Sequence, residues 1–525
     1  MPPRSGAEPG LDDAAACYRA GDVAAAEAIC RQLIPADPLA ADAAHLLGVL
    51  LHQRDRPAEA LAWLAYARDR LPGNAQLQDN LGLCLMALDR HQDAIAAFRT
   101  AIRLAGATAD RLSNLAIARR QAGEVEAAIG HGTAGLALSP LHAPARFNLA
   151  LALQQAGRLP EAQAALQALL TVAPPDRVGQ VANALAGVLG AQGRHDDAER
   201  MLDLALRATP GSALFRWNRA LLLLTTGRLA EGFAAYEVRW DVAEHTPAPA
   251  GHQVLDPDRV AGRRVLVVGE QGLGDSVQFV RYASLLAGRG AEVWLSVPPP
   301  LVWLFRDIAG VRGVVGTGDP TPPPDLVTAM LSLPLAFGTR LETIPAPRRY
   351  LSAPPGSRAA WAERLGDTGA RRIGVAWIGS QASAARSAMP LDALEGLLEM
   401  GAGGGMEIHS LVRDPSPADA ALLARYPAVR SHGPALRDLG DTAALIERLD
   451  LVITIDTAVA HVAGALGRPC WVMLPFTADW RWLTGRADSP WYPSMRLFRQ
   501  PRAGDWASVV AAVRAAVADE FVNLS

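Results

Sequence analysis

The sequence predicts two unlike parts: an all-α repeat superhelix over residues 1–240 and an α/β module over residues 263–525. In the first part, small residues recur about every 34 positions within a helical apolar pattern. In the second part, short apolar runs alternate with helical segments, as they do in parallel sheets. Residues 241–262 contain Pro and Gly without apolar periodicity and are interpreted as a linker.

The composition is that of a folded protein, with 50% hydrophobic and 20% charged residues. A net charge of −3 provides no general attraction to nucleic acid or to an anionic membrane. No apolar run reaches the roughly 18 residues of a membrane helix, and the N-terminus lacks a signal-peptide pattern. The four cysteines have no metal-ligand spacing. We therefore expect a cytoplasmic protein without a transmembrane segment.

The repeat is defined by one small residue per unit, at spacings of 34 or 36 residues. In six of the seven units, a Pro or Gly follows twelve residues later. This pattern resembles the tetratricopeptide repeat, in which small residues let paired helices touch. Stacked pairs form a superhelix whose groove binds extended protein segments. The seven positions are Ala26, Ala60, Ala94, Ala128, Ala162, Ala198 and Gly232.

Four repeat units carry an asparagine two residues before the small residue of the first helix: Asn80, Asn114, Asn148 and Asn218. An asparagine amide both donates and accepts hydrogen bonds, so a column of amides can hold a peptide backbone of any sequence. The column is similar to the asparagine ladder in the repeat domain of the O-linked N-acetylglucosamine transferases. The alternative is that asparagine is merely common at this repeat position.

The second part divides into two sets of strands, assigned to domains over residues 263–357 and 358–525. Each set is long enough for one doubly wound domain, which binds ligands at the carboxyl ends of its strands. A helix is predicted over residues 275–290. The predicted strands are RRVLVVG (263–269), AEVWLSV (291–297), RRIGVAW (371–377), MEIHSLV (406–412), LDLVITID (449–456) and RPCWVML (468–474).

The first candidate loop, GEQGLGDSVQF at residues 269–279, follows the first predicted strand. Gly272 and Gly274 would let a ligand approach the backbone, and Asp275 begins the next helix. The spacing G-x-x-G-x-G is neither the dinucleotide fingerprint nor a P-loop. Asp275 is therefore either a functional carboxylate or a simple helix cap.

The second candidate loop carries Asp456, Thr457 and His461 where a strand passes to a helix. If Asp456 caps this helix, Val459 and Val462 face the sheet, and Thr457 and His461 lie on the opposite side. His461 is then expected at the solvent or in a cleft.

The third candidate segment, residues 475–506, combines aromatic residues with arginines. Such a mixture suits a sugar or nucleobase beside phosphate, and the chain contains no lysine to bind phosphate instead. The alternative is that the aromatic residues pack an irregular C-terminal segment. They are Trp480, Trp482, Trp491, Tyr492 and Trp506.

Three motifs carry a family resemblance: GEQGLGD (269–275), DTAVAHVAGALGRP (456–469), and LPFTADWRWL (474–483) with SPWYPSMRLFRQ (489–500). They are similar to motifs of bacterial tetratricopeptide-repeat glycosyltransferases, whose catalytic module is related to glycosyltransferase family 9, the heptosyltransferases. The resemblance implies a GT-B fold of two Rossmann-like domains. It implies a nucleotide sugar bound mainly by the second domain, and neither a cofactor nor a metal.

The resemblance also assigns roles to residues. It makes Asp275 the general base acting on the acceptor, and it makes Asp456, Thr457 and His461 the cradle of the donor diphosphate. The nucleotide-sugar site would further include Gly272, Gly274, Trp377, Gly379 and Arg386. The family usually has a polar, basic loop after GVAWIGS (374–380), whereas the loop here, QASAARSAMPL, is alanine-rich. Asp256 and Asp258 match a metal-binding D-x-D, but their place in the linker argues against that role.

The leading hypothesis is therefore an inverting glycosyltransferase that moves a sugar from a nucleotide sugar to an acceptor hydroxyl on a protein or surface glycan. The repeats would present the acceptor. The alternative is a non-catalytic repeat scaffold with a degenerate transferase domain, which the altered loop at residues 380–389 favours. An NAD-dependent enzyme is disfavoured because no G-x-G-x-x-G follows a predicted strand.

Overall fold

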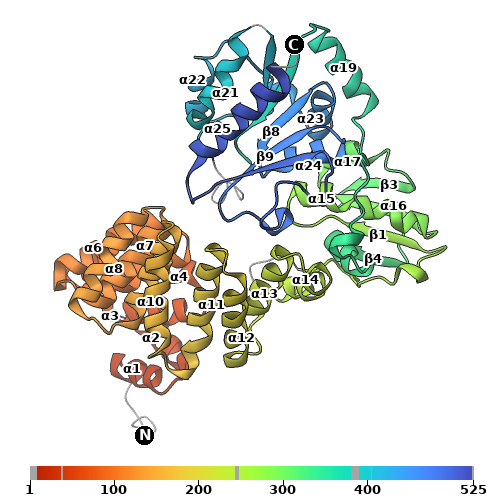
Figure 1. The fold of residues 1–525 in the computed structure, drawn as a ribbon. Coiled ribbons are helices and arrows are strands. Elements are labelled where there is room, and N and C mark those ends of the chain that lie inside the picture. The colour runs from red at the N-terminus through yellow and green to blue at the C-terminus, as the bar shows by residue number, and fades with distance from the viewer. Residues whose placement is uncertain (1–8, 37–39, 243–246, 380–388, 404, 523–525) are drawn as a thin grey trace. The chain divides into compact units, whose positions relative to one another are not determined.

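The computed structural model describes residues 9–36, 40–242, 247–379, 389–403 and 405–522. It divides into two compact units, Met1–Pro210 and Gly211–Ser525. The first unit consists of stacked helix pairs, and the second contains two parallel sheets flanked by helices (Figure 1). The fold class predicted from the sequence, helical repeats followed by an α/β module, is confirmed.

The described part of the first unit contains twelve helices, in which each helix packs on the next. They are α1 (Leu11–Arg19), α2 (Val23–Ala36), α3 (Ala41–Gln53), α4 (Pro57–Arg70), α5 (Ala75–Ala87), α6 (His91–Ala105), α7 (Ala109–Gln121), α8 (Val125–Leu138), α9 (Ala143–Gln155), α10 (Leu159–Leu170), α11 (Pro175–Ala191) and α12 (His195–Ala208).

The small residues of the repeat lie where paired helices touch. All seven predicted positions are buried. A Cβ atom on Gly48 would lie 2.6 Å from Leu64, and one on Gly82 would lie 2.5 Å from Phe98. Because such distances are below van der Waals contact, a larger residue at either position would require the neighbouring side chain or helix to shift.

The starts of successive repeats are fixed by polar caps that recur with the repeat period. Asn74, Thr108 and His142 each accept a hydrogen bond from the backbone N–H three residues ahead, at α5, α7 and α9 respectively. A side-chain cap satisfies one of the free N–H groups at a helix start and stabilises it by about 1 kcal/mol. The repeat is therefore encoded both in its helix contacts and in its turns.

The second unit begins with a seventh helix pair and continues into the two sheets. Its helices and strands are α13 (Ala213–Thr225), α14 (Leu229–Tyr236), β1 (Arg264–Val268), α15 (Leu273–Phe279), α16 (Arg281–Gly288), β2 (Glu292–Val297), α17 (Pro299–Phe305), β3 (Val311–Gly316), β4 (Leu326–Ala329), α18 (Leu333–Ala336), α19 (Pro355–Leu365), β5 (Arg371–Ala376), α21 (Glu395–Leu398), β6 (Met406–Ser410), α22 (Pro417–Leu423), β7 (Val429–Ser431), α23 (Leu439–Ile446), β8 (Leu451–Ile455), α24 (Ala458–Ala465), β9 (Cys470–Leu474), β10 (Met495–Arg499) and α25 (Trp506–Val517).

Short helical turns connect these elements. Among the described residues, eight are of the 3-10 type: η1 (Glu237–Asp241), η2 (Pro257–Arg259), η3 (Met330–Ser332), η4 (Leu341–Thr343), η5 (Leu391–Leu394), η6 (Glu399–Gly403), η7 (Gly433–Ala435) and η8 (Trp480–Trp482). A π turn, η9 (Ala518–Val522), follows α25.

Both sheets are parallel, and both reverse their strand order at one point. The first sheet has the order β3-β2-β1-β4, and the second has the order β10-β9-β8-β5-β6-β7. In the second sheet the order reverses between β5 and β8, as in a Rossmann fold, and the carboxyl ends of strands at such a switch point form a ligand crevice. Strands β8 and β9 are buried along their whole length, which accounts for their unbroken apolar sequences.

The sequence prediction of these elements is right for six strands and incomplete elsewhere. The helix predicted over residues 275–290 is two helices, α15 and α16, which meet at Val280. The sequence does not predict strands β3, β4, β7 and β10. Strands β4 and β10 are short and follow proline-containing segments, and proline argues against a strand in a sequence-based prediction. The segment predicted as a linker is paired to the first sheet, because Gln253 N–H donates to the Val327 carbonyl at 3.0 Å.

The seventh helix pair is packed into the α/β module. Phe233 of α14 meets Phe279 of α15 edge to face at 6.3 Å between ring centroids, and Trp480 of η8 at 5.8 Å. Arg239 of η1 is buried and donates to both carboxylate oxygens of Glu270 at 2.9 Å. Residues 211–241 therefore belong structurally with the sheets, although their sequence continues the repeat.

Candidate functional site

The glycine loop after β1 ends in a capped helix start. The Gly272 N–H donates to the Asp275 Oδ2 at 2.8 Å, so Asp275 closes the first turn of α15 onto its own N-terminus. Gln271, just before it, has a φ of 58°, a left-handed conformation that few residues with side chains adopt. Its side chain is held by Tyr236, which receives a hydrogen bond from Gln271 Nε2 at 3.0 Å.

The loop after β8 has a different cap from the one the sequence predicts. Thr457, and not Asp456, is the N-cap of α24, because the Thr457 hydroxyl accepts a hydrogen bond from the Val459 N–H at 3.2 Å. The assignment of Asp456 as the cap is therefore wrong. Asp456 instead lies at the carboxyl end of β8, at the switch point of the second sheet.

The expectation that His461 faces solvent or an open cleft is also wrong. Its side chain is 4% exposed, and its Nδ1 lies 2.8 Å from the Tyr492 hydroxyl. Its ring stacks on Trp482 with centroids 5.5 Å apart. Burial, followed by the charge of Arg481, lowers the pKa of His461 to about 3, so the imidazole is neutral at physiological pH.

Helices α15 and α24 pack directly against each other, which explains this burial. A Cβ atom at Gly274 would lie 2.7 Å from His461 Cδ2 and 3.5 Å from the Ala458 Cα. The missing side chain of Gly274 therefore makes room for the His461 ring. The glycine was expected to open the loop to a ligand, and in the structure it admits a helix of the other sheet.

Arg481 connects the two loops, and the sequence marks it only as one of several arginines in the aromatic segment. It is 8% exposed and forms ion pairs with Asp275 of α15 and, at 2.7 Å, with Asp479. Its guanidinium lies over the Trp480 ring at 4.3 Å from the centroid. The only signal in the sequence was the W-R-W pattern within an aromatic segment, because the chain offers many other arginines.

The carboxylates around Arg481 have altered proton affinities. Burial raises the pKa of Asp275, an effect opposed by the charge of Arg481 and by the Gly272 N–H. Burial and the charge of Asp479 raise the pKa of Asp456 to about 7. Perturbed carboxylates close together are typical of sites that bind charged ligands or move protons, although structural ion pairs produce them as well.

The structure brings together some of the predicted donor-site residues and leaves one undescribed. Trp377 follows β5 at the same switch point as Asp456, and its side chain is fully buried. Gly379 lies two residues further along, outside any helix or strand. Arg386 lies outside the described residues, and so does most of its loop.

Most of the aromatic residues of the third segment pack the interior. Trp480, Trp482, Trp491 and Tyr492 are each at most 4% exposed and belong to the core of the second unit. Trp506, at the start of α25, is partly buried against the same core. Of the two alternatives left open by the sequence, interior packing describes these residues.

Arg281, a buried arginine of α16, links the aromatic segment to the helices beside the first sheet. Arg281 of α16 donates to the Trp491 carbonyl at 2.7 Å, to the Pro345 carbonyl at 3.0 Å and to the Tyr350 hydroxyl at 2.9 Å. Its guanidinium also lies 4.7 Å from the Tyr492 ring centroid. Arg281 and Arg481 thus join the two sheets' helices and loops at separate points.

Two asparagines of the repeat column contact the preceding repeat. Asn80 Nδ2 lies 2.8 Å from His45 Nε2, and Asn148 Nδ2 donates to the Ser113 hydroxyl at 2.8 Å. Both partners precede the asparagine by 35 residues, so the contact recurs with the repeat. Asn114 and Asn218 occupy the equivalent places on α7 and α13, and both are partly buried. At least part of the column therefore stabilises the stack of repeats.

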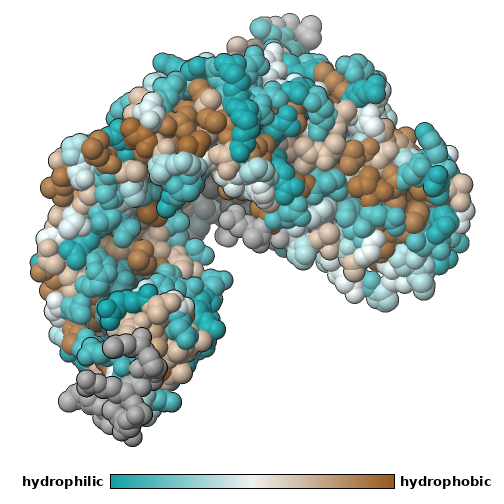
Figure 2. Space-filling model, turned by 90° about the horizontal axis from the view of Figure 1, so that it is seen from below, coloured by the Kyte–Doolittle hydropathy of each residue, from teal (hydrophilic) through white to brown (hydrophobic). Residues whose placement is uncertain are grey.

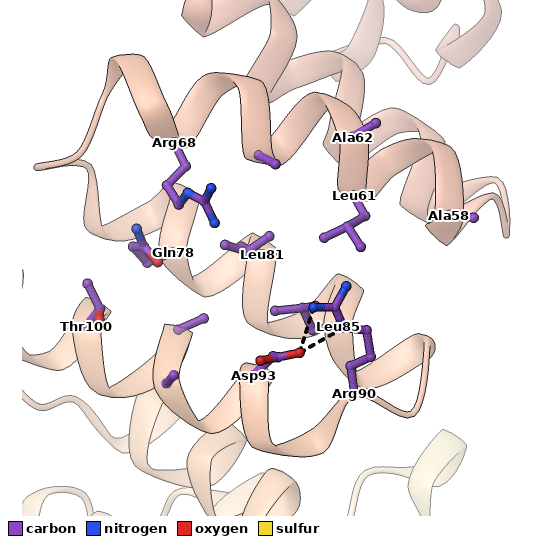
Figure 3. Close-up of a pocket in the computed structure, with 13 residues that line it drawn as sticks. Ala58, Leu61, Ala62, Arg68, Gln78, Leu81, Leu85, Arg90, Asp93 and Thr100 are labelled. Carbon is purple, nitrogen blue, oxygen red and sulfur yellow. Dashed lines mark hydrogen bonds and ion pairs between the residues drawn. The ribbon is translucent and has the colours of Figure 1, made fainter.

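A groove of about 670 Å³ lies on the first unit, between α4, α5 and α6. Figure 3 shows the apolar side chains of Leu61, Leu81 and Leu85 lining it, with the ion pair of Arg90 and Asp93 at one end. None of the predicted asparagines lines this groove.

The surface mixes apolar and polar residues on the face seen in Figure 2. On the repeats, exposed apolar side chains recur with the repeat period at Leu104, Leu138 and Val172. Within the part of the chain that the structure describes, no helix is long and apolar enough to cross a membrane.

Comparison with known families supports both parts of the chain. Models of the tetratricopeptide repeat match residues 14–75, 75–108, 141–210 and 183–239. The model of glycosyltransferase family 9 (heptosyltransferase) matches residues 436–474, which include α23, β8, α24 and β9. The match therefore covers Asp456, Thr457 and His461 but not the first sheet.

Among individual proteins, the chain is similar to protein FlbA of Caulobacter vibrioides, with 28% identity over 349 residues. The alignment covers 60% of this chain and 57% of that protein, so the chain spans little more than half of its relative's length.

Solved repeat structures are more distant. A tetratricopeptide repeat protein from Parabacteroides merdae is 17% identical, with a TM-score of 0.39, and the match covers 43% of this chain and 90% of that one. A thermophilic repeat protein of Thermus thermophilus is 22% identical, with a TM-score of 0.31, over 35% of this chain and 99% of that one. The first part of the chain thus matches the tetratricopeptide repeat, and the second part is similar to glycosyltransferase family 9 over the strands and helices around the second switch point.

Proposed function

We propose that the α/β module is a glycosyltransferase of GT-B type that moves a sugar from a nucleotide sugar to an acceptor hydroxyl. One observation carries the proposal. Asp275 of α15, beside the first sheet, forms an ion pair with Arg481 of η8, which follows β9 of the second sheet. The pair lies close to Asp456 at the switch point of the second sheet. A carboxylate can act as the base on the acceptor hydroxyl, and a cation can stabilise the charge that develops on the departing diphosphate.

In the proposed reaction, Asp275 accepts the proton of the acceptor hydroxyl as the oxygen attacks the anomeric carbon. The attack from the face opposite the leaving group inverts that carbon. A base works best when its pKa lies near the working pH, and burial shifts the pKa of Asp275 in that direction. Arg481 would balance the charge of the departing diphosphate in place of a metal ion.

His461 receives a narrower role than the family resemblance implies. Because its imidazole is neutral and buried, it cannot supply positive charge to a diphosphate. We assign it to positioning: it orders Trp482 by stacking and Tyr492 by a hydrogen bond. Thr457 is occupied as the helix cap, and its hydroxyl also lies 3.2 Å from the Thr454 hydroxyl.

The repeats would present a protein or peptide acceptor, since stacked repeats commonly bind extended segments. We expect no cofactor beyond the nucleotide sugar, and we expect that a chelator leaves transfer unchanged. We also propose a cytoplasmic location, where the four free cysteines would remain reduced.

A second candidate function, a repeat scaffold with an inactive transferase module, is favoured by one observation. The helices that would bound the substrate cleft are in contact at Gly274 and His461, and the candidate base is already ion-paired. Under this alternative the contact is permanent.

Calorimetry with a panel of UDP-, GDP- and ADP-sugars separates the two functions. A transferase binds at least one of them, and that sugar is then transferred to an acceptor detected by mass spectrometry of cell proteins and surface glycans. If the full-length chain binds none of the panel, the transferase proposal fails and the scaffold remains.

A further inference from the structure

We propose that Arg481 is a ligand-operated latch: it holds Asp275 while the donor site is empty, and it transfers to the donor diphosphate when that ligand binds, which releases Asp275 to act as the base. This inference rests on the proposed function and adds to it an exchange of partners at Arg481 and an order of events. It starts from the ion pair between Arg481 and Asp275, which joins loops of the two sheets.

Arg481 has a buried hydrogen-bond donor that is not used by the described residues. Its Nη1 donates to Asp479 at 2.7 Å and its Nη2 pairs with Asp275, but its buried Nε has no hydrogen-bond partner among the described residues. A buried, unpartnered donor on a cation is costly, and an acceptor-rich anion relieves that cost. A diphosphate offers several oxygens to one planar guanidinium.

Contacts within its own segment keep Arg481 in place after it releases Asp275. Asp479 is bound to Arg481 twice over, because it also accepts a hydrogen bond from the Arg481 backbone N–H at 3.1 Å. The Trp480 ring supports the guanidinium from one face. These contacts lie within one segment and do not depend on Asp275, so the guanidinium can exchange one anion while it keeps the other.

The ion pair with Arg481 affects how readily Asp275 accepts a proton. While Arg481 is bound to it, the carboxylate is a poor proton acceptor, because the ion pair stabilises its charged form. When a diphosphate takes the guanidinium, Asp275 keeps the Gly272 N–H and regains its basicity. The acceptor oxygen then bonds to the anomeric carbon, the bond from that carbon to the phosphate oxygen breaks, Asp275 takes the hydroxyl proton, and the nucleoside diphosphate keeps the electron pair beside Arg481.

The latch makes a prediction that a purely structural ion pair does not. Asp275 and the ligand compete for one cation, so removing the charge of Asp275 strengthens anion binding. Inorganic pyrophosphate serves as the probe, because it contains the diphosphate and nothing else of the donor. Its dissociation constant is measured by calorimetry on the full-length chain in the wild type and in three variants.

We expect Arg481→Gln to weaken pyrophosphate binding at least about ten-fold, as the loss of a charge-assisted hydrogen bond does. We expect Asp275→Asn to tighten it several-fold. The matched control is Arg486→Gln, in the same segment, because Arg486 pairs with Asp488 at the surface and should leave the affinity unchanged. If Arg481→Gln does not fold, the pyrophosphate dissociation constant of Asp275→Asn is sufficient to test the inference.

The inference is overturned if the wild type does not bind pyrophosphate at millimolar concentration, or if Asp275→Asn binds it no more tightly than the wild type. The proposed function fails by a different result, which is the absence of sugar transfer. If pyrophosphate binding depends on Arg481 and is tighter in Asp275→Asn, but no sugar is transferred, the exchange at Arg481 stands and the proposed function fails. If the wild type transfers sugar but Asp275→Asn binds pyrophosphate with unchanged affinity, the proposed function stands and the latch is wrong.

Discussion

Tyr236, the last residue of the seventh repeat helix pair, is hydrogen-bonded to Gln271, which precedes the glycine that starts α15. The two side chains join the repeat sequence to the loop that carries Asp275. Nearby, Arg239 holds Glu270 through both of its carboxylate oxygens. The last repeat therefore helps to hold the glycine loop of the candidate site in place. A substitution in this repeat should change the stability of that loop.

Tyr236→Phe removes this contact without changing the packed ring. Because Gln271 has a left-handed backbone held by the contact, we expect a stability loss of about 1 kcal/mol, measured by chemical denaturation. We also expect faster proteolysis within residues 269–275. The matched control is Tyr18→Phe, which removes a Tyr–Gln hydrogen bond at an exposed place in the first unit. Equal proteolysis of this loop in both variants would contradict the proposed coupling.

Asp275→Asn tests the base. The amide keeps the size of the side chain but cannot take a proton, so transfer should fall by about 100-fold or more while nucleotide-sugar binding is retained or strengthened. Turnover and calorimetry on the same preparation measure both. Asp258→Asn is the control, because Asp258 is an exposed carboxylate outside the glycine loop that pairs with Arg289. Near-normal turnover of Asp275→Asn would show that Asp275 is not the general base.

Asp456→Asn should change the pH dependence of stability. The folded-state pKa of about 7 lies above the unfolded value of about 4, so Asp456 contributes stability that is present below about pH 4 and lost as the pH rises through about 7. The variant, which has no charge to bury, should therefore gain stability over the wild type between about pH 5.5 and about pH 8. A relative gain in Tm of about 2–4 °C is expected in thermal unfolding.

The control for this experiment is Asp488→Asn. Arg486 lowers the pKa of Asp488, so that carboxylate is charged throughout the same pH range. The difference between this variant and the wild type should stay constant with pH. A pH-independent difference for Asp456→Asn would show that Asp456 does not titrate as described.

Gly274→Ala tests the contact of α15 with α24. The new methyl group would lie 2.7 Å from the His461 ring, so the helices must separate or the ring must turn. We expect a loss of about 1–3 kcal/mol in the free energy of unfolding. Gly288→Ala, at the end of α16, meets no atom within 4 Å and should be neutral or slightly stabilising. Equal stability of the two variants would mean that the helices are not in contact in solution.

Gly82→Ala tests the repeat packing in the same way. Its methyl group would lie 2.5 Å from Phe98, which is fully buried between α5 and α6. A loss of about 1–3 kcal/mol is expected in the unfolding of the repeats, followed by circular dichroism. Gly130→Ala in α8, where nothing lies within 4 Å, is the matched control and should not destabilise the repeats. A stable Gly82→Ala variant would contradict the tight helix contact.

The sequence by itself determined the features that local pattern encodes. The seven small residues predicted the contacts between paired helices, because a touching helix pair needs a small residue once in each repeat. The apolar runs at residues 451–455 and 470–474 predicted buried parallel strands, because both faces of such strands are covered. The place of Asp456 and of the glycine loop after strands followed from the same patterns.

Only the tertiary structure decided what the side chains at those places touch. Helical periodicity put His461 opposite the apolar face, but a second packing surface, α15 with Gly274, covers that side as well. Arg481 pairs with Asp275 across two sheets, and no local pattern marks one arginine among many as the one that reaches a distant carboxylate. Contacts between residues far apart in the chain depend on how the sheets are brought together, and sequence periodicity describes only one element at a time.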